Sequence, residues 1–260
     1  MKSLPPFYIF SIIALSGCLN TTPPDSLTGP EALFDPQVTE LTLEIDYTGE
    51  DAAPSTGLTQ LRQIDPWSLT EDNLRALFGD AVTINVPNEL DEMQDIGDQP
   101  EGEDQEYSSK EILEISSRTR DQQPTATSQS LHIIFVDGYF KDSEGVRKEN
   151  VLGVSIGDTG VIAMFKPVIA GGTLEKFVEQ TTLIHEIGHA AGLVNNGIDM
   201  EEDHHDEEHG AHCTNQDCVM YYQNEGLADL RDFITRYQTK GTTVLFDANC
   251  IQDTRAARGQ

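Results

Sequence analysis

The stretch TTLIHEIGHAAG, residues 181–192, constrains the fold more than any other part of this chain. It completes an apolar pattern over residues 174–191 whose spacing is typical of a helix that buries one face. We expect Thr173 to cap this helix and Gly192 to end it, because glycine readily adopts the left-handed conformation of a residue just past a helix. The chain must therefore fold around one long, largely buried helix.

Two histidines on this helix are four residues apart, and a glutamate follows the first: His185, Glu186 and His189. Side chains four apart lie on one helix face, with Cβ atoms roughly 5 to 6 Å apart, so both imidazoles can bind one metal ion. Glu186 lies one residue round, where it can take a proton from water without being a ligand. Imidazole ligands with one open position suit zinc. The alternative is a helix with two surface histidines, since so short a motif also arises by chance.

Two stretches resemble one protease family. HEIGHAAG resembles the HExxHxxG start of the metzincin metalloproteases, and HCTNQDCVM resembles the archaemetzincin stretch in which the third zinc histidine directly precedes Cys-x4-Cys-x-Met. The resemblance covers roughly residues 174–222. It implies an α/β (α+β) metzincin-like domain with a mixed twisted sheet, an active-site helix and a C-terminal helix. It also implies three zinc ligands, His185, His189 and His212, and a Met-turn residue, Met220, beneath the metal.

The position of the third ligand departs from the family pattern. In the family a histidine follows the glycine by three residues, where this chain has Asn195, and His212 follows Gly192 by twenty. We interpret residues 195–211 as an acidic, His-rich insertion that leaves His212 near the metal. The insertion is either a solvated loop or a source of ligands. As a source of ligands, it could replace His212 with His204 or His209, or it could itself capture zinc or calcium.

Tyr222 and the cysteines leave further alternatives. Tyr222 resembles the tyrosine that some metzincins use to stabilise the oxyanion, but a tyrosine that only packs is the simpler interpretation. Archaemetzincins complete a second metal site with a further Cys-x2-Cys pair, whereas here only Cys250 follows Cys218. A second zinc with four thiolates is therefore excluded. Three cysteines can form one disulfide and leave one free thiol, or their thiolates can bind a metal. Of these outcomes we expect a disulfide between Cys213 and Cys218, or one that involves Cys250, in an exported protein.

The rest of the chain predicts a β-α-β opening followed by further strands. We expect strands over 38–47, 81–86 and 131–140, two strands around a turn within 151–165, an acidic loop over 88–107, and helices over 68–80, 108–120 and 225–238. Ser68 and Glu71 have the spacing of a capping box. We expect the helix over 225–238 to pack under the sheet and residues 244–250 to be extended.

The first residues read as a targeting segment. Lys2, an apolar run over 7–15 and the sequence LSGC resemble a bacterial lipoprotein signal peptide, residues 1–17, in which Cys18 is lipidated. An ordinary signal peptide is the alternative. Residues 18–37 are rich in Thr, Pro and Asp and read as a tether, so the domain would span residues 38–260. We expect an exported lipoprotein on the outer membrane or cell envelope, facing the periplasm or the exterior.

The charge excludes one class of partner. The net charge of −29 disfavours binding to nucleic acid and to anionic headgroups, so any membrane attachment should come from the lipid anchor alone. The motif predicts zinc-dependent peptide-bond hydrolysis with one catalytic Zn²⁺, a peptide or protein substrate, and the strand over 152–156 as the edge that pairs with it. The alternatives are a non-catalytic zinc-binding or zinc-buffering lipoprotein and an interaction module that has lost catalysis.

Overall fold

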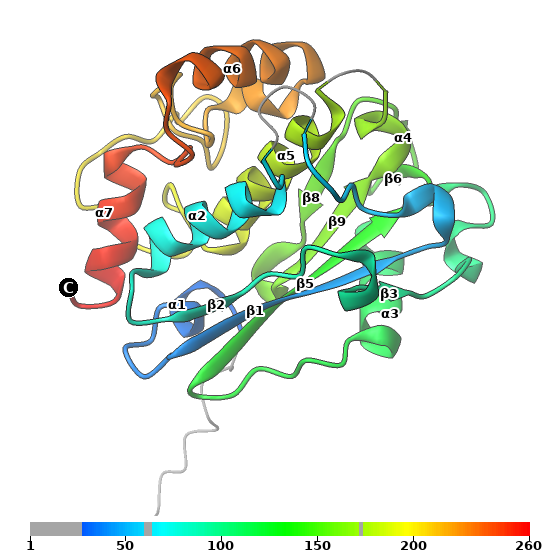
Figure 1. Ribbon diagram of the computed structural model, residues 1–260, viewed down its shortest axis with the longest axis horizontal. Coiled ribbons are helices and arrows are strands. Elements are labelled where there is room, and N and C mark those ends of the chain that lie inside the picture. Colours follow the sequence, from blue (N-terminus) through cyan, green and yellow to red (C-terminus); the bar gives the residue numbers. More distant parts are fainter. Residues whose placement is uncertain (1–27, 60–63, 172–173) are drawn as a thin grey trace, which may run out of the picture.

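The centre of the fold is a twisted, mostly parallel β-sheet. The structure is a computed structural model and describes residues 28–59, 64–171 and 174–260. Strands follow the order β2-β1-β5-β9-β8, with β3 paired to the end of β1 (Figure 1). Among the described strands of this sheet, only β8 and β9 pair in antiparallel. The strands are β1 Glu40–Tyr47, β2 Thr83–Asn85, β3 Gln94–Asp95, β5 Ser128–Val136, β8 Gly153–Ser155 and β9 Val161–Phe165.

A second, smaller sheet lies beside the first. It has the order β4-β6-β7, with β4 and β6 parallel and β6 and β7 antiparallel. Its strands are β4 Glu106–Tyr107, β6 Tyr139–Lys141 and β7 Arg147–Lys148. The segment over 131–140 is therefore two strands, not the one that we expected. The break falls at Gly138, where a Cβ atom would lie 2.6 Å from Cε2 of Tyr107 and 2.8 Å from the carbonyl oxygen of Gln105.

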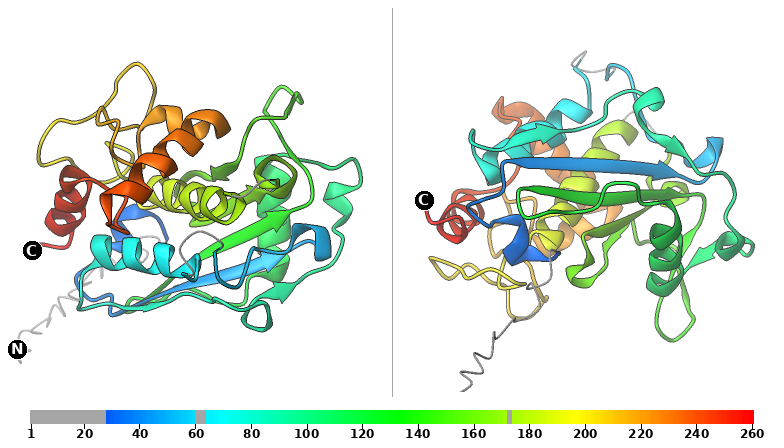
Figure 2. Two further views of the ribbon diagram at one scale, coloured as in Figure 1. Left: turned by 45° about the horizontal axis from the view of Figure 1, so that its top comes forward. Right: turned by 90° about the horizontal axis from the view of Figure 1, so that it is seen from below.

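Helices cover both faces of the large sheet (Figure 2). On β5, Phe135 contacts Trp67 of α2, with ring centroids 6.4 Å apart, and His132 contacts Ser116 of α3. Residues an odd number apart on a strand point to opposite faces, so α2 and α3 lie on opposite sides. The helices are α1 Pro30–Leu33, α2 Trp67–Phe78, α3 Ser109–Thr119, α4 Lys166–Ile169, α5 Glu175–Ala190, α6 Leu227–Lys240 and α7 Ala248–Ala257.

Short 3₁₀ turns join several of these elements. They are η1 Glu50–Ala52, η2 Leu90–Glu92, η3 Pro100–Gly102, η4 Gly157–Thr159 and η5 Tyr222–Glu225. The expected acidic loop over 88–107 contains η2, η3, β3 and β4, so short regular elements interrupt it. Among the residues that the structure describes, no helix combines the length and the apolar character that a membrane crossing requires.

The mixed α/β class predicted from the sequence is confirmed, while three further local expectations are wrong. The helix over 68–80 begins at Trp67, and Ser68 donates a hydrogen bond to the carbonyl of Asp65 instead of capping the helix. Helix α6 packs on α5, on its side away from the sheet (Figure 1). Cys250 lies in α7, because Asp247 accepts a hydrogen bond from the Cys250 amide and starts a helix where we expected an extended segment.

The helix that carries the motif is the buried centre of one layer. Helix α5 contacts α2, α6, β8 and β9, which explains why most of its residues from Phe177 to Ala190 are buried. It ends at Gly192, whose φ is 73°. The amide of Leu193 donates to the carbonyl of Gly188, and the amide of Gly192 donates to that of His189. This pair of hydrogen bonds is a Schellman motif, so Gly192 ends the helix as we expected from the sequence. The proposed cap Thr173 lies outside the described residues.

Candidate metal centre

Two of the three predicted ligands come from adjacent turns of α5. His185 and His189 have ring centroids 4.7 Å apart, and their Nε2 atoms are 3.1 Å apart. His185 is only 2% exposed. His189 is half-buried and faces the ring of His185, so the alternative of two surface histidines is wrong.

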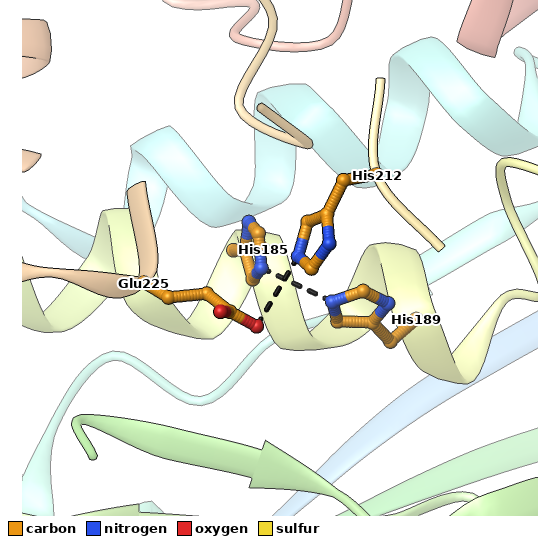
Figure 3. A group of neighbouring side chains, drawn as sticks. All are labelled: His185, His189, His212 and Glu225. Atoms are coloured by element: carbon orange, nitrogen blue, oxygen red, sulfur yellow. Dashed lines mark hydrogen bonds and ion pairs between the residues drawn. The ribbon is translucent and has the colours of Figure 1, made fainter. Parts of the chain in front are cut away.

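The third imidazole reaches the same point from a loop. The ring of His212 lies 5.3 Å from that of His185 and 5.0 Å from that of His189, measured between centroids (Figure 3). Its side chain is buried. The residues of the insertion therefore leave the end of α5 and return to it. His185, His189, His212 and Glu225 each offer a ligand atom, and these atoms all lie within 4.8 Å of one another.

Backbone carbonyls fix two of the rings. Nδ1 of His185 lies 2.8 Å from the carbonyl oxygen of Val219, and Nδ1 of His212 lies 2.7 Å from that of His209. A carbonyl can only accept, so each Nδ1 carries the proton. Each Nε2 is therefore the nitrogen that would bind a metal, and its proton would have to leave first where it carries one. An outer partner on Nδ1 orients such a ligand and raises its basicity.

Met220 lies directly beneath the helix that carries the two histidines. It is fully buried, and a Cβ atom added at Gly188 would lie 2.2 Å from its Sδ. The helix can approach Met220 this closely only because position 188 has no side chain. The predicted Met-turn residue therefore supports the turn of α5 between His185 and His189.

Glu186 is buried and held by the edge strand of the sheet. Its Oε2 accepts a hydrogen bond of 2.8 Å from the backbone amide of Ser155, and 7% of the residue is exposed. Burial raises the pKa of Glu186 to about 8. A carboxyl group with a pKa near neutrality can both accept and release a proton at physiological pH. Glu186 contributes no atom to the group of four ligand atoms.

Glu225 is the one site residue that sequence reasoning missed. Its Oε1 lies 3.2 Å from Nε2 of His212, although 59% of the side chain is exposed. Burial alone would raise the pKa of Glu225, but the interaction with His212 outweighs this effect, so the pKa is lowered. Burial alone would lower the pKa of His212, but the interactions with its neighbours, above all Glu225, outweigh this effect, so the pKa is raised. No spacing signal in the sequence identifies a glutamate thirteen residues after His212, and only the fold brings it there.

The other two histidines and Tyr222 have different partners. Nε2 of His204 lies 2.7 Å from Oδ2 of Asp253, and its Nδ1 faces Cys213. His209 stacks on Tyr222 at 3.6 Å between ring centroids, with the planes 8° apart. Neither histidine belongs to the ligand group around His185 within the described residues. The stack favours a packing role for Tyr222.

Asn195 has no place in the ligand group. It is exposed and adopts a φ of 59°, so it continues the left-handed turn at the end of α5. Asparagine tolerates this conformation better than most residues. Its side chain is therefore explained by the turn.

The three described cysteines correct the expectation of a disulfide. Cys213, Cys218 and Cys250 are all free and fully buried. Sγ of Cys218 lies 3.6 Å from Sγ of Cys250, whereas a disulfide needs about 2.05 Å.

A buried polar group on the other side of the sheet resembles a catalytic triad in composition only. Oγ of Ser116 lies 2.8 Å from Nδ1 of His132, whose Nε2 lies 2.8 Å from Oδ2 of Asp46. His132 and Asp46 have no exposed surface, and 4% of Ser116 is exposed. A substrate cannot reach these atoms, so the group serves to join α3 to the sheet.

A cleft opens in front of His185 and His189. Its volume is about 310 Å³. One wall is residues 150–155, which include the edge strand β8, and the other walls come from Phe140, α5, Asn224 and Glu225. An extended chain in this cleft would lie beside an unpaired strand edge and close to Glu186.

No family model matches the chain, and no curated protein matches it. Among solved structures, the chain is similar to a zinc-dependent peptidase from Methanocorpusculum labreanum, at 14% sequence identity and a TM-score of 0.46. The similarity covers 82% of this chain and 99% of that chain. The chemistry of the site rests on its own residues.

Proposed function

We propose that this chain is a zinc-dependent metallopeptidase of the metzincin type, in which His185, His189 and His212 hold the ion. One observation carries the proposal: three imidazoles meet at one point, and a buried glutamate that is not a ligand adjoins them. A site that only stores metal has no need of such a glutamate.

The donor set fits zinc. Three neutral imidazoles with an open fourth position are a common arrangement in catalytic zinc sites. Burial lowers the pKa of His185 to about 4 and also lowers that of His189, so both rings are neutral at pH 7 and available as ligands. Zinc in this position would activate water as a nucleophile and polarise the scissile carbonyl.

Glu186 moves the proton in this proposal. Its carboxylate takes a proton from the attacking water and then delivers it to the leaving amine, so the peptide bond breaks without a free amide anion. The Ser155 amide holds Oε2, which leaves Oε1 for the water. A divalent charge nearby favours the carboxylate over the neutral acid. The pKa of about 8 would therefore fall toward the range of a general base.

Strand β8 is the proposed binding edge for substrate. It pairs with β9 on one side only, and its residues form a wall of the cleft. A peptide could add to this edge as a further strand, with backbone hydrogen bonds that any sequence can make. Strand addition would bring the scissile bond close to Glu186, since Ser155 belongs to β8 and its amide binds this carboxylate.

A zinc-buffering lipoprotein is the second candidate, and Glu225 is the observation that favours it. A fourth ligand at this position would close the site, as in structural zinc centres. However, 59% of the Glu225 side chain is exposed, so it can leave without opening the core. In an enzyme, Glu225→Gln should retain at least part of the peptidase activity. In a metal store, the same change should weaken zinc binding and no peptide should be cleaved by either form.

Glu186→Gln tests the peptidase proposal directly. The amide cannot accept a proton, so hydrolysis of a mixed peptide library should be lost while zinc content stays the same. Glu207→Gln is the matched control, because that glutamate is exposed on the insertion. Full activity in Glu186→Gln would exclude this residue as the base, and no cleavage by the unmodified protein would favour the metal store.

The third ligand has its own test. His212→Ala should lower zinc affinity by orders of magnitude and remove activity, while Asn195→Ala should change neither. If His204→Ala or His209→Ala abolishes activity while His212→Ala does not, the insertion supplies the catalytic ligand.

We further propose that a lipid on Cys18 anchors the protein to the outer membrane, with the catalytic domain in the periplasm or outside. Cys18 lies outside the described residues, and the support is the sequence LSGC after an apolar run. Leu19, instead of Asp, resembles the pattern of lipoproteins sent on to the outer membrane. Cys18→Ser should move the protein out of the membrane fraction, and a mature N-terminus elsewhere without lipid mass would reject the proposal.

A further inference from the structure

Three free cysteines and one histidine meet in a buried cluster next to the histidine centre. Cys213 and Cys218 come from the loop after the insertion, and Cys250 comes from the first turn of α7. His204 comes from the insertion itself. Nothing in the proposed peptidase chemistry uses any of these four side chains.

The spacing of the sulfur atoms matches a tetrahedral metal site. Zinc binds thiolates at about 2.3 Å, so two thiolates on one tetrahedral ion lie about 3.8 Å apart. The Sγ atoms of Cys218 and Cys250 are 3.6 Å apart. A disulfide would require much closer approach, at about 2.05 Å. The two thiols therefore fit ligands of a shared ion better than partners in a covalent bond.

His204 completes the cluster with the geometry of an oriented ligand. Its Nδ1 lies 3.3 Å from Sγ of Cys213, and atoms of His204, Cys213, Cys250 and Asp247 all lie within 4.8 Å of one another. Its Nε2 faces Oδ2 of Asp253 at 2.7 Å, and both side chains are buried. A carboxylate on the far nitrogen is the usual outer partner of a metal-binding histidine.

Backbone amides point at two of the sulfur atoms. The amide of Asn215 donates to Sγ of Cys213, and the amide of Asp247 donates to Sγ of Cys218, both at 3.4 Å. Hydrogen bonds to the charged form stabilise thiolates in a buried site. Oδ1 of Asp247 accepts from the Cys250 amide and caps α7. Its Oδ2 accepts from Nδ2 of Asn215 at 2.8 Å and from Sγ of Cys213 at 3.4 Å, so this carboxylate lies at the edge of the cluster and is held by other groups.

We propose that His204, Cys213, Cys218 and Cys250 bind a second, structural metal ion of the zinc class. One imidazole and three thiolates in a closed, buried tetrahedron are a common structural zinc set. The insertion thus supplies a ligand to this second centre, and His212 remains the ligand of the first. The proposal does not depend on peptidase activity.

The second ion would also fix the first site. Cys213 directly follows His212, and the Cys213 amide donates to the carbonyl of Met220 at 2.8 Å. The amide of Thr214 donates to the carbonyl of His204 at 2.9 Å. A bond through the ion between residues 204 and 213 would close the loop that presents His212. His204 is therefore a positioning residue for the first centre.

Metal content tests the proposal. The full chain with Cys18→Ser, which removes the lipid site and its thiol, should hold two zinc ions after dialysis. His204→Ala and Cys250→Ser should each hold one, and His205→Ala, a change at the neighbouring histidine, should hold two. His204→Cys should keep the second ion, because a fourth thiolate replaces the imidazole. Equal zinc in the parent, His204→Ala and Cys250→Ser would overturn the proposal.

Two further measurements guard against loss of folding and separate the two sites. Cobalt loaded into the parent should give the near-ultraviolet charge-transfer band of a thiolate complex. His189→Ala should keep this band, and Cys250→Ser should lose it, whatever the activity. Three titratable thiols after unfolding in chelator without reductant would agree with the proposal. One thiol would show a disulfide and overturn it.

Discussion

Adding a single methyl group at Gly188 should change stability in opposite directions depending on Met220. A Cβ at position 188 would lie 2.2 Å from Sδ of Met220 and 3.1 Å from both Cε of Met220 and Cε1 of Phe246. Both side chains are buried, so the overlap cannot be relieved toward solvent. Such overpacking destabilises a core by about 1 to 3 kcal/mol. Alanine in a helix regains about 1 kcal/mol over glycine. Gly188→Ala alone should therefore lower the free energy of unfolding by up to about 2 kcal/mol.

The same change should be stabilising once the methionine is truncated. Met220→Ala should cost about 2 to 5 kcal/mol, because it leaves a cavity under the helix. In that background the added methyl group meets no sulfur, and the ring of Phe246, 3.1 Å away, can shift into the cavity. The gain of about 1 kcal/mol in helix propensity should then dominate. The coupling between the two positions should be about 1 to 3 kcal/mol.

Urea unfolding of four proteins measures this coupling: the parent, both single variants and the double variant. Saturating zinc and equal m values keep the comparison within one folding equilibrium, and zinc content is measured in parallel. If Gly188→Ala destabilises the parent and the Met220→Ala protein equally, this prediction is wrong, and the close contact with Met220 is not the reason for glycine at position 188.

Three further predictions concern other parts of the structure. Lys166→Met should destabilise the fold by about 3 to 5 kcal/mol in thermal or urea unfolding, because it leaves the carboxylate of Glu179 buried without its cation. Adding Glu179→Gln to this variant should recover part of the lost stability. Gly153→Ala should lower kcat by about 10- to 100-fold at unchanged zinc content, because the new Cβ would lie 2.9 Å from Cγ of Glu186 and displace that side chain. An unchanged kcat would show that the carboxylate tolerates the shift. Removing metal with a chelator should speed proteolysis within residues 195–211, read by mass spectrometry, and zinc should reverse this; equal cleavage rates with and without zinc would show that metal does not hold this loop.

The sequence predicted the motif helix well because its signals are local. The apolar spacing set the extent of α5, and Gly192 ends it with the expected hydrogen bonds. The capping box of Ser108 and Glu111 likewise begins α3 where the helix was expected. At α2 the same kind of signal misled, since Trp67 enters the core and starts the helix before Ser68.

The long-range parts of the site were beyond local signals. The family pattern led to His212, but no pattern indicated Glu225, which approaches through the turn before α6. The cysteines were expected to pair because only their number and compartment were visible. Their partner His204 depends on how a 17-residue insertion folds back, and its composition also fits a solvated loop. The physical reason is the same in each case: these contacts depend on tertiary packing and leave no periodic trace.

The hydrogen bond from the His212 ring to the carbonyl of His209 has a consequence for how this loop can change over evolution. The insertion contains the His209 carbonyl, which accepts the hydrogen bond from Nδ1 of His212 and sets the tautomer of that ring. The loop and the ligand therefore depend on each other. A shorter connection with a histidine near position 195 would need a new acceptor at the same time as it gained the imidazole. Gradual trimming, one residue at a time, would first pass through chains whose third histidine has lost this acceptor for Nδ1. Lengths between the short and long forms should accordingly be rare among active relatives of this chain, while the exposed tip at Glu207 and Glu208 is free to vary in sequence.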